Sequence, residues 1–531
     1  MKKIVLLALA VISVVSSFCQ KTDNFSAITA HNIEIKLFPN KAENIIPKEI
    51  YGQFAEHLGR CIYGGIWVGK DSPIPNIDGY RKDVVEALKA LEVPVIRWPG
   101  GCFADEYHWM DGVGPLENRP RMVNSNWGGT VEDNSFGTHE FLNLCEILGC
   151  DAYISGNVGT GSPEELQKWV EYMTSDTNST MAEMRRKNGR EKPWYVKYLG
   201  IGNEAWGCGG EMEPEFYSML YRQFAHFSGG GAFKVASGGN AVDYNWTKVL
   251  MQKIGKERMN GISLHYYAVT DWGTNPDGSG RKGSSTNYSR EEYYRTLIQS
   301  LAIDDCIQNH IKEMDKADPE NKVALMVDEW GTWWNPEPGT NPGWLYNQST
   351  MRDAIVASTS LDIFQKYVHR VKMTNIAQMV NVLQAMILTD EKNPASPCLL
   401  TPTYYVYKMY KVHKENKFVP GKIETDWVHL SDGKGVPFVS YTASRKDDGT
   451  IYLSLTNMDY DNEHLVSVAL DGKNIKTAKG EILTSNDIHA YNDFGRQEIE
   501  NREFKKFTIS KNNITLSLPA HSIVTIALNV K

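Results

Sequence analysis

Cysteine is scarce in this chain of 531 residues, and its eight cysteines are dispersed with no CxxC pair. This pattern predicts neither a disulfide framework nor a zinc module, and most of these cysteines are expected to be buried thiols. A single disulfide bridge stays open. Positive charge is also in deficit, because 56 basic residues stand against 64 acidic ones. The resulting net charge of −8 disfavours a nucleic-acid partner.

Several motifs that mark other enzyme classes are absent. The sequence has no GxSxG elbow, no HExxH, no P-loop and no dinucleotide fingerprint. The histidines near the predicted strand ends are too scattered in sequence to predict a metal site: His57, His108, His139 and His265. No cofactor is therefore implied.

Long apolar runs are missing except at the N-terminus. There, Met1-Lys2-Lys3 precedes a nearly unbroken apolar run from Ile4 to Val15. The run is too short to span a bilayer, so residues 1–19 are interpreted as a cleavable signal peptide. A lipoprotein acylated at Cys19 is the alternative, which the bulky Phe18 disfavours. The protein is thus expected to be exported, as a periplasmic or secreted protein, with no membrane span.

Alternating apolar and amphipathic segments dominate the part of the chain between residues 49 and 415. Eight strand-like apolar runs occur there, at 49–56, 93–97, 151–157, 195–204, 233–237, 262–267, 323–329 and 376–388. Helical patterns separate them, at 82–92, 138–148, 163–187, 214–227, 247–256, 290–316 and 351–368, and 401–412 is typical of a closing helix. Eight such units predict a (β/α)8 TIM barrel over 49–415.

The C-terminal part has a different pattern. Residues 416–531 contain short alternating runs and turn pairs such as Asp447-Asp-Gly449, which predict an antiparallel, jelly-roll-like β-sandwich. The expected strands are 437–442, 450–455, 465–470, 506–509, 514–518 and 523–528. Within the N-terminal segment 20–48, residues 33–37 are expected to add a strand to the sandwich.

Two carboxylates stand at the ends of strongly apolar strands. Glu204 ends the fourth predicted barrel strand and Glu329 ends the seventh. Barrel active sites lie at these carboxyl ends, so the two side chains are expected to converge across the mouth. A pair of convergent carboxylates performs glycoside hydrolysis, one as a proton donor and the other as an ionised nucleophile.

Other polar residues at the same strand ends suit this chemistry. Arg97 can keep a neighbouring carboxylate ionised, and Asn203 can bind a sugar hydroxyl next to the reacting carbon. A tyrosine within 265–267 can orient the nucleophile. His265 is open to two interpretations, a structural histidine of the barrel mouth or a contact of the substrate.

The chain resembles the α-L-arabinofuranosidases of glycoside hydrolase family 51. The matching stretches are long and span the barrel: 50–66, 97–115, 202–204, 328–331 and 375–383. The resemblance implies a catalytic barrel with a C-terminal β-sandwich, and a retaining double displacement. In that reaction Glu204 would be the general acid/base and Glu329 the nucleophile. The resemblance also implies a homo-oligomer, and an arabinose-containing oligo- or polysaccharide as the partner.

The family pattern also implies the substrate contacts. Glu56, Asn203 and the residue at position 102 would surround the furanose, and Tyr267 would support the nucleophile. Trp127 would lie near the leaving-group sugar, and Gln378 is carried over as a further contact. Some members have asparagine where this chain has Cys102. A thiol donates weakly, so this contact is expected to be weaker.

Three functions remain open from the sequence. The first is an exo-acting enzyme that removes α-L-arabinofuranosyl units from arabinan, arabinoxylan or derived oligosaccharides. The second keeps both glutamates but acts on another sugar, as an endo-β-glucanase or β-xylosidase. The third is a non-catalytic carbohydrate-binding protein on the same barrel.

Overall fold

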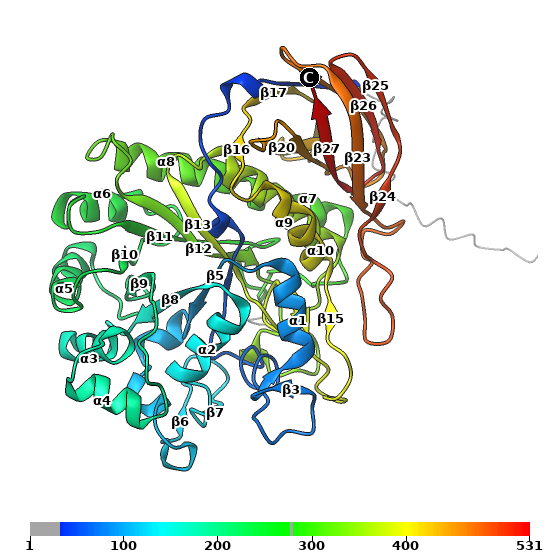
Figure 1. Cartoon of the computed structure of the whole chain (residues 1–531). Coiled ribbons are helices and arrows are strands. Elements are labelled where there is room, and N and C mark those ends of the chain that lie inside the picture. Colours follow the sequence, from blue (N-terminus) through cyan, green and yellow to red (C-terminus); the bar gives the residue numbers. More distant parts are fainter. Residues whose placement is uncertain (1–31, 277–279) are drawn as a thin grey trace, which may run out of the picture.

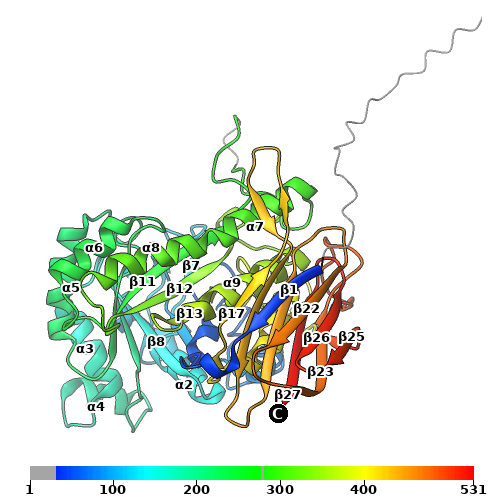
Figure 2. The same ribbon diagram turned by 90° about the horizontal axis from the view of Figure 1, so that it is seen from above.

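The computed structural model describes residues 32–276 and 280–531 (Figure 1). The predicted signal peptide, 1–19, lies outside the described residues. Figures 1 and 2 show two units side by side, a barrel with its surrounding helices and a sandwich of long strands. Among the described residues, no helix combines the length and apolar character needed to cross a bilayer.

Eight parallel strands close into a barrel, which confirms the predicted TIM-barrel class. Around the barrel their order is β10-β11-β12-β13-β2-β5-β8-β9. The strands are β2 (Gly52–Phe54), β5 (Val95–Trp98), β8 (Asp151–Gly156), β9 (Tyr198–Ile201), β10 (Phe233–Ala236), β11 (Gly261–Ala268), β12 (Ala324–Thr332) and β13 (Val371–Ala377). Their carboxyl ends form one mouth, into which the loops after β2, β5, β9 and β11 bring polar side chains.

Helices surround the barrel and begin at recognisable caps. Ser162 caps the helix that starts with Pro163, and Ser289 with Glu292 forms a capping box. The α-helices are α1 (Lys82–Leu91), α2 (Thr138–Leu148), α3 (Pro163–Thr174), α4 (Thr180–Lys187), α5 (Pro214–Phe227), α6 (Tyr244–Lys253), α7 (Arg290–Leu301), α8 (Ile303–Asp315), α9 (Met351–Lys366) and α10 (Pro402–Tyr410).

Three segments differ from the sequence-based prediction. The single helix expected over 290–316 is two helices that meet at Ala302, so that α8 contacts α6 while α7 contacts β19 (Gly435–Pro437), which pairs with β18 (Trp427–His429) in a separate two-stranded sheet. The strand expected over 49–56 begins as a 3-10 turn, Lys48–Tyr51. The strand expected over 376–388 is β13, which ends at Ala377, followed by a buried loop. Since most residues of this loop are apolar and its polar residues Gln378, Asn381 and Gln384 are buried too, periodicity cannot distinguish it from a buried strand.

The C-terminal unit is a β-sandwich of two sheets, as the alternating pattern predicts. One sheet has the order β17-β1-β22-β26-β25 and the other β16-β20-β21-β27-β23-β24. Their strands are β1 (Asn32–Leu37), β16 (Lys417–Phe418), β17 (Gly421–Glu424), β20 (Val439–Arg445), β21 (Ile451–Asn457), β22 (His464–Leu470), β23 (Ile475–Leu483), β24 (Arg502–Phe504), β25 (Phe507–Ser510), β26 (Asn513–Leu518) and β27 (Ile523–Val530).

The N-terminal strand β1 is part of this sandwich. It pairs in parallel with β22 and antiparallel with β17, and Figure 2 shows it in blue among the later strands. The strand β23 is absent from the sequence-based prediction, because four of its nine residues are Lys, Thr or Glu and most of its side chains are not buried. The domain limits proposed from the sequence stay a prediction.

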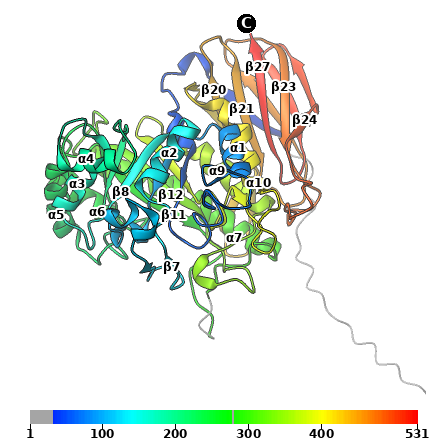
Figure 3. The same cartoon turned by 60° about the horizontal axis from the view of Figure 1, so that its bottom comes forward.

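The helix α9 connects the two units. Its side chains from Met351 to Gln365 are all buried, since barrel strands cover one side and β20 covers the other. Figure 3 shows the sandwich strands directly beside α9 and α10. Asp362 of α9 accepts hydrogen bonds from Ser440 Oγ at 2.6 Å and Tyr410 Oη at 3.0 Å. Burial raises the pKa of this carboxyl to about 8.

This buried aspartate predicts a pH-dependent stability. An unfolded aspartate has a pKa of about 3.9, so the folded state binds the proton more tightly. Its contribution to stability is complete below pH 3.9 and is lost as the pH rises through about 8. Relative to Asp362→Asn, the wild type is expected to lose up to about 1.4 kcal/mol of unfolding free energy per pH unit within this window. Urea unfolding of both proteins at pH 5 and 8 measures this, and an unchanged difference would contradict it.

Candidate active site at the barrel mouth

The two glutamates lie close together at the mouth. Glu204 follows β9 in a tight turn and has a positive φ of 36°, and Glu329 belongs to β12. His265 of β11 stands between them, with Nδ1 2.9 Å from Glu204 Oε1 and 3.5 Å from Glu329 Oε2. One oxygen of each carboxylate and a nitrogen of His265 all lie within 4.8 Å of one another. The structure thus brings both predicted carboxylates to one point.

Glu329 is held by two strong donors. Arg97 Nη1 donates to its Oε2 at 2.9 Å, and Tyr267 Oη donates to its Oε1 at 2.8 Å. Arg97 is buried and also donates to the Asn203 side chain. A buried guanidinium and a phenol therefore hold this carboxylate by its two opposite oxygens.

His265 is surrounded by acidic groups. Burial alone lowers its pKa, but the carboxylates of Glu329, Asp328 and Glu204 outweigh this and raise the pKa to about 10. Asp328 itself accepts hydrogen bonds from Tyr153 Oη and Ser263 Oγ, both at 2.6 Å. His265 is therefore a cation at neutral pH, placed between the two glutamates.

Glu56, at the end of β2, forms a second buried carboxyl group. Its Oε1 accepts from the backbone N–H groups of Gly101 and Phe103 at 3.0 and 3.1 Å and from Trp127 Nε1 at 3.0 Å. Gln378 Nε2 donates to Oε2 at 3.2 Å. Burial raises its pKa to about 7, and the charge of Glu329 adds to the rise.

A glycine allows Glu56 and Glu329 to approach each other. A Cβ added at Gly101 would lie 3.2 Å from Glu329 Oε2 and 3.4 Å from Glu56 Oε1. The backbone at Gly101 therefore fills the space between these two carboxyls. All of the sequence-predicted site residues gather in this region: Glu56, Arg97, Cys102, Trp127, Asn203, Glu204, His265, Tyr267, Glu329 and Gln378. Their roles in binding and catalysis stay predictions.

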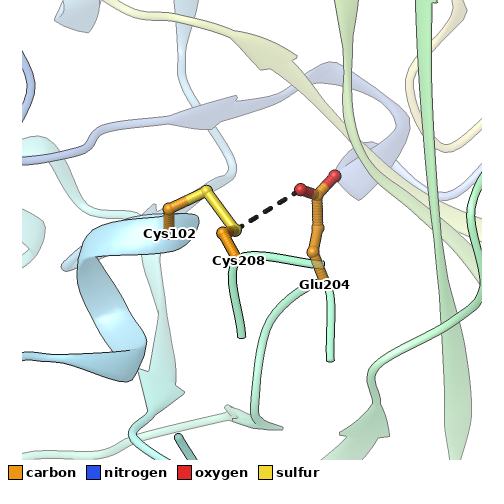
Figure 4. Close-up of side chains that lie close together, drawn as sticks. All are labelled: Cys102, Glu204 and Cys208. Atoms are coloured by element: carbon orange, nitrogen blue, oxygen red, sulfur yellow. Dashed lines mark hydrogen bonds between the residues drawn. A yellow bond between two sulfur atoms is a disulfide. The ribbon is translucent and has the colours of Figure 1, made fainter. Parts of the chain in front are cut away.

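Cys102 differs from the expectation of a free thiol. It forms a disulfide with Cys208, which lies 106 residues away in the sequence (Figure 4). The bridge joins the 3-10 turn after β5, Cys102–Asp105, to the loop that carries Glu204. A disulfide sulfur has no hydrogen, so in this state Cys102 cannot donate to a sugar hydroxyl. The other described cysteines are free: Cys61, Cys145, Cys150, Cys306 and Cys398.

Asp105 is a residue of the site that escaped the sequence analysis. Asp105 accepts backbone N–H groups of Val158, Gly159 and Asn203 at 2.7 to 2.9 Å, and so fixes the loops after β8 and β9. The sequence could have indicated Asp105, because an acidic residue that is buried within a glycine-rich segment needs hydrogen-bond donors from the protein itself. Trp333 packs edge-on against Tyr267, with ring centroids 4.9 Å apart.

Two side-chain clusters among the described residues have ligand atoms close enough for a metal ion: Glu204, His265 and Glu329, and Cys102, Glu204 and Cys208. In the first cluster, Arg97 already neutralises Glu329 and His265 is protonated, so a further cation is disfavoured. The arrangement there suits proton transfer and nucleophilic attack by carboxylates.

Comparison with known proteins identifies relatives along the whole barrel and sandwich. Residues 87–276 match the α-L-arabinofuranosidase 1 domain, and residues 328–522 match the α-L-arabinofuranosidase C-terminal domain. An intracellular exo-α-L-arabinofuranosidase from Bacteroides ovatus is 56% identical over 499 residues, which cover 93% of this chain and 95% of the relative.

Solved structures give the same result. The crystal structure of the family 51 arabinofuranosidase from Xanthomonas axonopodis pv. citri has a TM-score of 0.90 at 46% identity, covering 94% of this chain and 100% of that one. The α-L-arabinofuranosidase from Thermotoga maritima, solved as an arabinose complex, has a TM-score of 0.78 at 28% identity, with 93% and 99% covered.

The Bacteroides relative corrects one prediction. It is an intracellular enzyme, which contradicts the prediction that this chain is periplasmic or secreted. That prediction depended only on the apolar run within residues 1–19, outside the described part of the chain. The sequence identities and the structural match, in contrast, agree on the family. The chain is a glycoside hydrolase and belongs to the α-L-arabinofuranosidases of family 51.

Proposed function

We propose that this enzyme releases terminal α-L-arabinofuranosyl residues from arabinan, arabinoxylan or derived oligosaccharides, with retention of anomeric configuration. One observation carries the mechanism: oxygens of Glu204 and Glu329 lie within 4.8 Å of each other. Retaining glycosidases hold their carboxyl groups about 5 Å apart, whereas inverting enzymes need about 6.5 to 9.5 Å to admit a water. The exo-activity of the Bacteroides ovatus relative supports the choice of sugar and of end group.

The surroundings of the two glutamates support different roles. Glu329 is the more buried, and the cation Arg97 and the phenol Tyr267 donate to its two oxygens, which positions the carboxylate for attack on the anomeric carbon. Glu204 shares His265 with Glu329 but has no arginine partner, and its side chain is the more exposed of the two, at 20% against 11%, as the residue that meets the leaving group should be. Glu204 therefore donates the proton to the glycosidic oxygen.

In the second step the covalent arabinosyl-enzyme is hydrolysed. Glu204, now ionised, takes a proton from a water that attacks the same carbon, and Glu329 is the leaving group. The protonated His265, 2.9 Å from Glu204 Oε1, stabilises the negative charge that returns to this side chain in each cycle. Glu56, Asn203 and Gln378 provide hydrogen-bond partners for the furanose hydroxyls.

Release of 4-nitrophenol from two pentosides tests the sugar. We expect kcat/KM for the α-L-arabinofuranoside to exceed that for the β-D-xyloside by about 100-fold or more, because a site built to hydrogen-bond one set of hydroxyls rejects another. On arabinan, an exo-acting enzyme should release arabinose alone. Greater activity on the xyloside, or a ladder of oligosaccharides from the polymer, would contradict the proposal. The homo-oligomer implied by the resemblance is part of the same proposal, and sedimentation velocity measures it.

Tyr267→Phe is expected to lower kcat by about 10 to 100-fold with little change in KM, because the lost donor acts on the nucleophile rather than on the bound sugar. Phenylalanine keeps the ring that packs against Trp333. Steady-state kinetics on the 4-nitrophenyl arabinofuranoside measures the change. A matched control is Tyr195→Phe, on an exposed tyrosine, which should leave both constants unchanged. An increase in KM alone for Tyr267→Phe would place this tyrosine in substrate binding instead.

A further inference from the structure

We propose that Cys102, Cys208 and Glu204 form an inhibitory site for a thiophilic divalent cation, such as Zn²⁺ or Cd²⁺, once the disulfide is reduced. The disulfide is then the closed state of this site, which protects the enzyme from the cation. The inhibitory effect rests on the proposed function in one respect, the proton transfer assigned to Glu204. The binding of the cation rests only on the three side chains.

The distances fit such a site closely. Cys208 Sγ lies 3.6 Å from Glu204 Oε2, and the two sulfurs and this carboxylate all have ligand atoms within 4.8 Å of one another (Figure 4). In a tetrahedral zinc site with Zn–S of about 2.3 Å and Zn–O of about 2.0 Å, sulfur and oxygen ligands are about 3.6 Å apart. The separation of Cys208 from Glu204 therefore already equals one edge of the tetrahedron.

Only the two sulfurs must separate. In the disulfide they are bonded, and in a tetrahedral site they would be about 3.8 Å apart. The Cα atoms of Cys102 and Cys208 are 5.5 Å apart, and rotation of the side chains about their Cα–Cβ bonds can provide the change. The fold need not move, since Asp105, in the turn that carries Cys102, accepts the backbone N–H of Asn203 at 2.8 Å and so fixes the loop that carries Cys208.

Reduction creates the ligands. A dithiol reductant gives two electrons and two protons to the bridge, so that the S–S bond breaks, two thiols form and the reductant becomes a disulfide. The cation then displaces both thiol protons to solvent. Two thiolates and one carboxylate bind it, and thiolates select Zn²⁺ and Cd²⁺ over Mg²⁺ and Ca²⁺.

The site is open to solvent and its occupation stops catalysis. Cys208 is exposed, and Cys102 and Glu204 are half-buried, so a cation can enter from the mouth and keep a water as fourth ligand. A metal on Glu204 Oε2 prevents this carboxylate from carrying a proton to the leaving group. His265 Nδ1 keeps its contact with the other oxygen of Glu204, Oε1, at 2.9 Å. This contact orients the carboxylate toward the cation.

Cadmium titration of the full-length enzyme tests the proposal, with ultraviolet thiolate-to-cadmium absorption and 4-nitrophenol release as separate readouts. Enzyme reduced with dithiothreitol and desalted without oxygen should bind one Cd²⁺ with this absorption. Its activity should fall by about tenfold or more and return with EDTA. Enzyme kept oxidised should show neither effect. Inhibition of both forms at the same cadmium concentration would overturn the proposal, because it would place the ion on Glu204, His265 and Glu329 instead.

Three variants separate this site from the other thiols. Cys208→Ser should lose both the absorption and the inhibition, whereas the matched control Cys150→Ser, at another half-buried free cysteine, should keep both. Glu204→Gln should still give the absorption but bind Cd²⁺ about tenfold more weakly, because an amide oxygen is a poorer ligand. The thiolate-to-cadmium absorption needs no turnover. The cadmium site can therefore be tested even if the protein lacks arabinofuranosidase activity. Undiminished absorption in Cys208→Ser, or absorption without loss of activity in the wild type, would overturn the proposal.

Discussion

Glu329→Gln is expected to lower kcat on the 4-nitrophenyl arabinofuranoside by about four orders of magnitude or more. An amide oxygen cannot form and release the covalent arabinosyl bond, and removal of a catalytic nucleophile has effects of about this size. Glutamine keeps the volume of the side chain, and its single oxygen can accept from Arg97 while its amide group donates to Tyr267 Oη. Stopped assays at high enzyme concentration measure the residual rate.

The matched control for this variant is Glu257→Gln, on a glutamate at the surface that lies 3.6 Å from Lys322 Nζ. It should leave kcat unchanged, and thermal unfolding of both variants establishes that both are folded. A folded Glu329→Gln enzyme that retains more than about one per cent of the wild-type kcat would exclude Glu329 as the nucleophile.

Glu204→Ala is expected to lower kcat on arabino-oligosaccharides by about 10³ to 10⁴-fold, yet to affect kcat/KM on the 4-nitrophenyl substrate much less. An oligosaccharide leaves as an alkoxide and needs a proton, whereas 4-nitrophenolate is stable without one. The vacated space next to His265 should also admit azide, which would attack the arabinosyl-enzyme without general-base help. The account therefore predicts faster release of 4-nitrophenol when azide is added, with arabinosyl azide as product.

Kinetics on both substrates, with and without azide, measure these effects. Glu211→Ala, at a glutamate in the same loop that follows β9, is the control and should behave as wild type with both substrates. An equal loss on the two substrates in Glu204→Ala, without rescue by azide, would contradict the role of proton donor.

The barrel and its two glutamates could be predicted from the sequence because each glutamate stands where a buried strand ends. A parallel strand covered on both faces is a continuous apolar run, so Glu204 and Glu329 stand out where such runs end. The same reasoning found Arg97 and Asn203, each at a strand end, and indicated a tyrosine within 265–267, which the family resemblance then specified as Tyr267. It failed at 376–388, where a loop is as apolar as a strand, because Gln378 and its neighbours are buried on all sides.

The features that could not be predicted depend on contacts between residues far apart in the chain, and such contacts produce no recognisable spacing in the sequence. Cys102 and Cys208 lie 106 residues apart and meet only because the loops after β5 and β9 share the barrel mouth. Asp105 acts through backbone N–H groups of distant loops, and any residue type can supply these. The two metal-ligand clusters emerge only when such loops are assembled.

The central claim is a double displacement by two carboxylates within reach of each other. Proton NMR of the first product in D₂O, recorded before mutarotation, tests it most directly. Hydrolysis of the 4-nitrophenyl α-L-arabinofuranoside should first produce α-L-arabinofuranose, because two inversions restore the original configuration. Appearance of the β-anomer first would mean a single displacement by water, and it would contradict both the covalent intermediate at Glu329 and the account of the site given by its geometry.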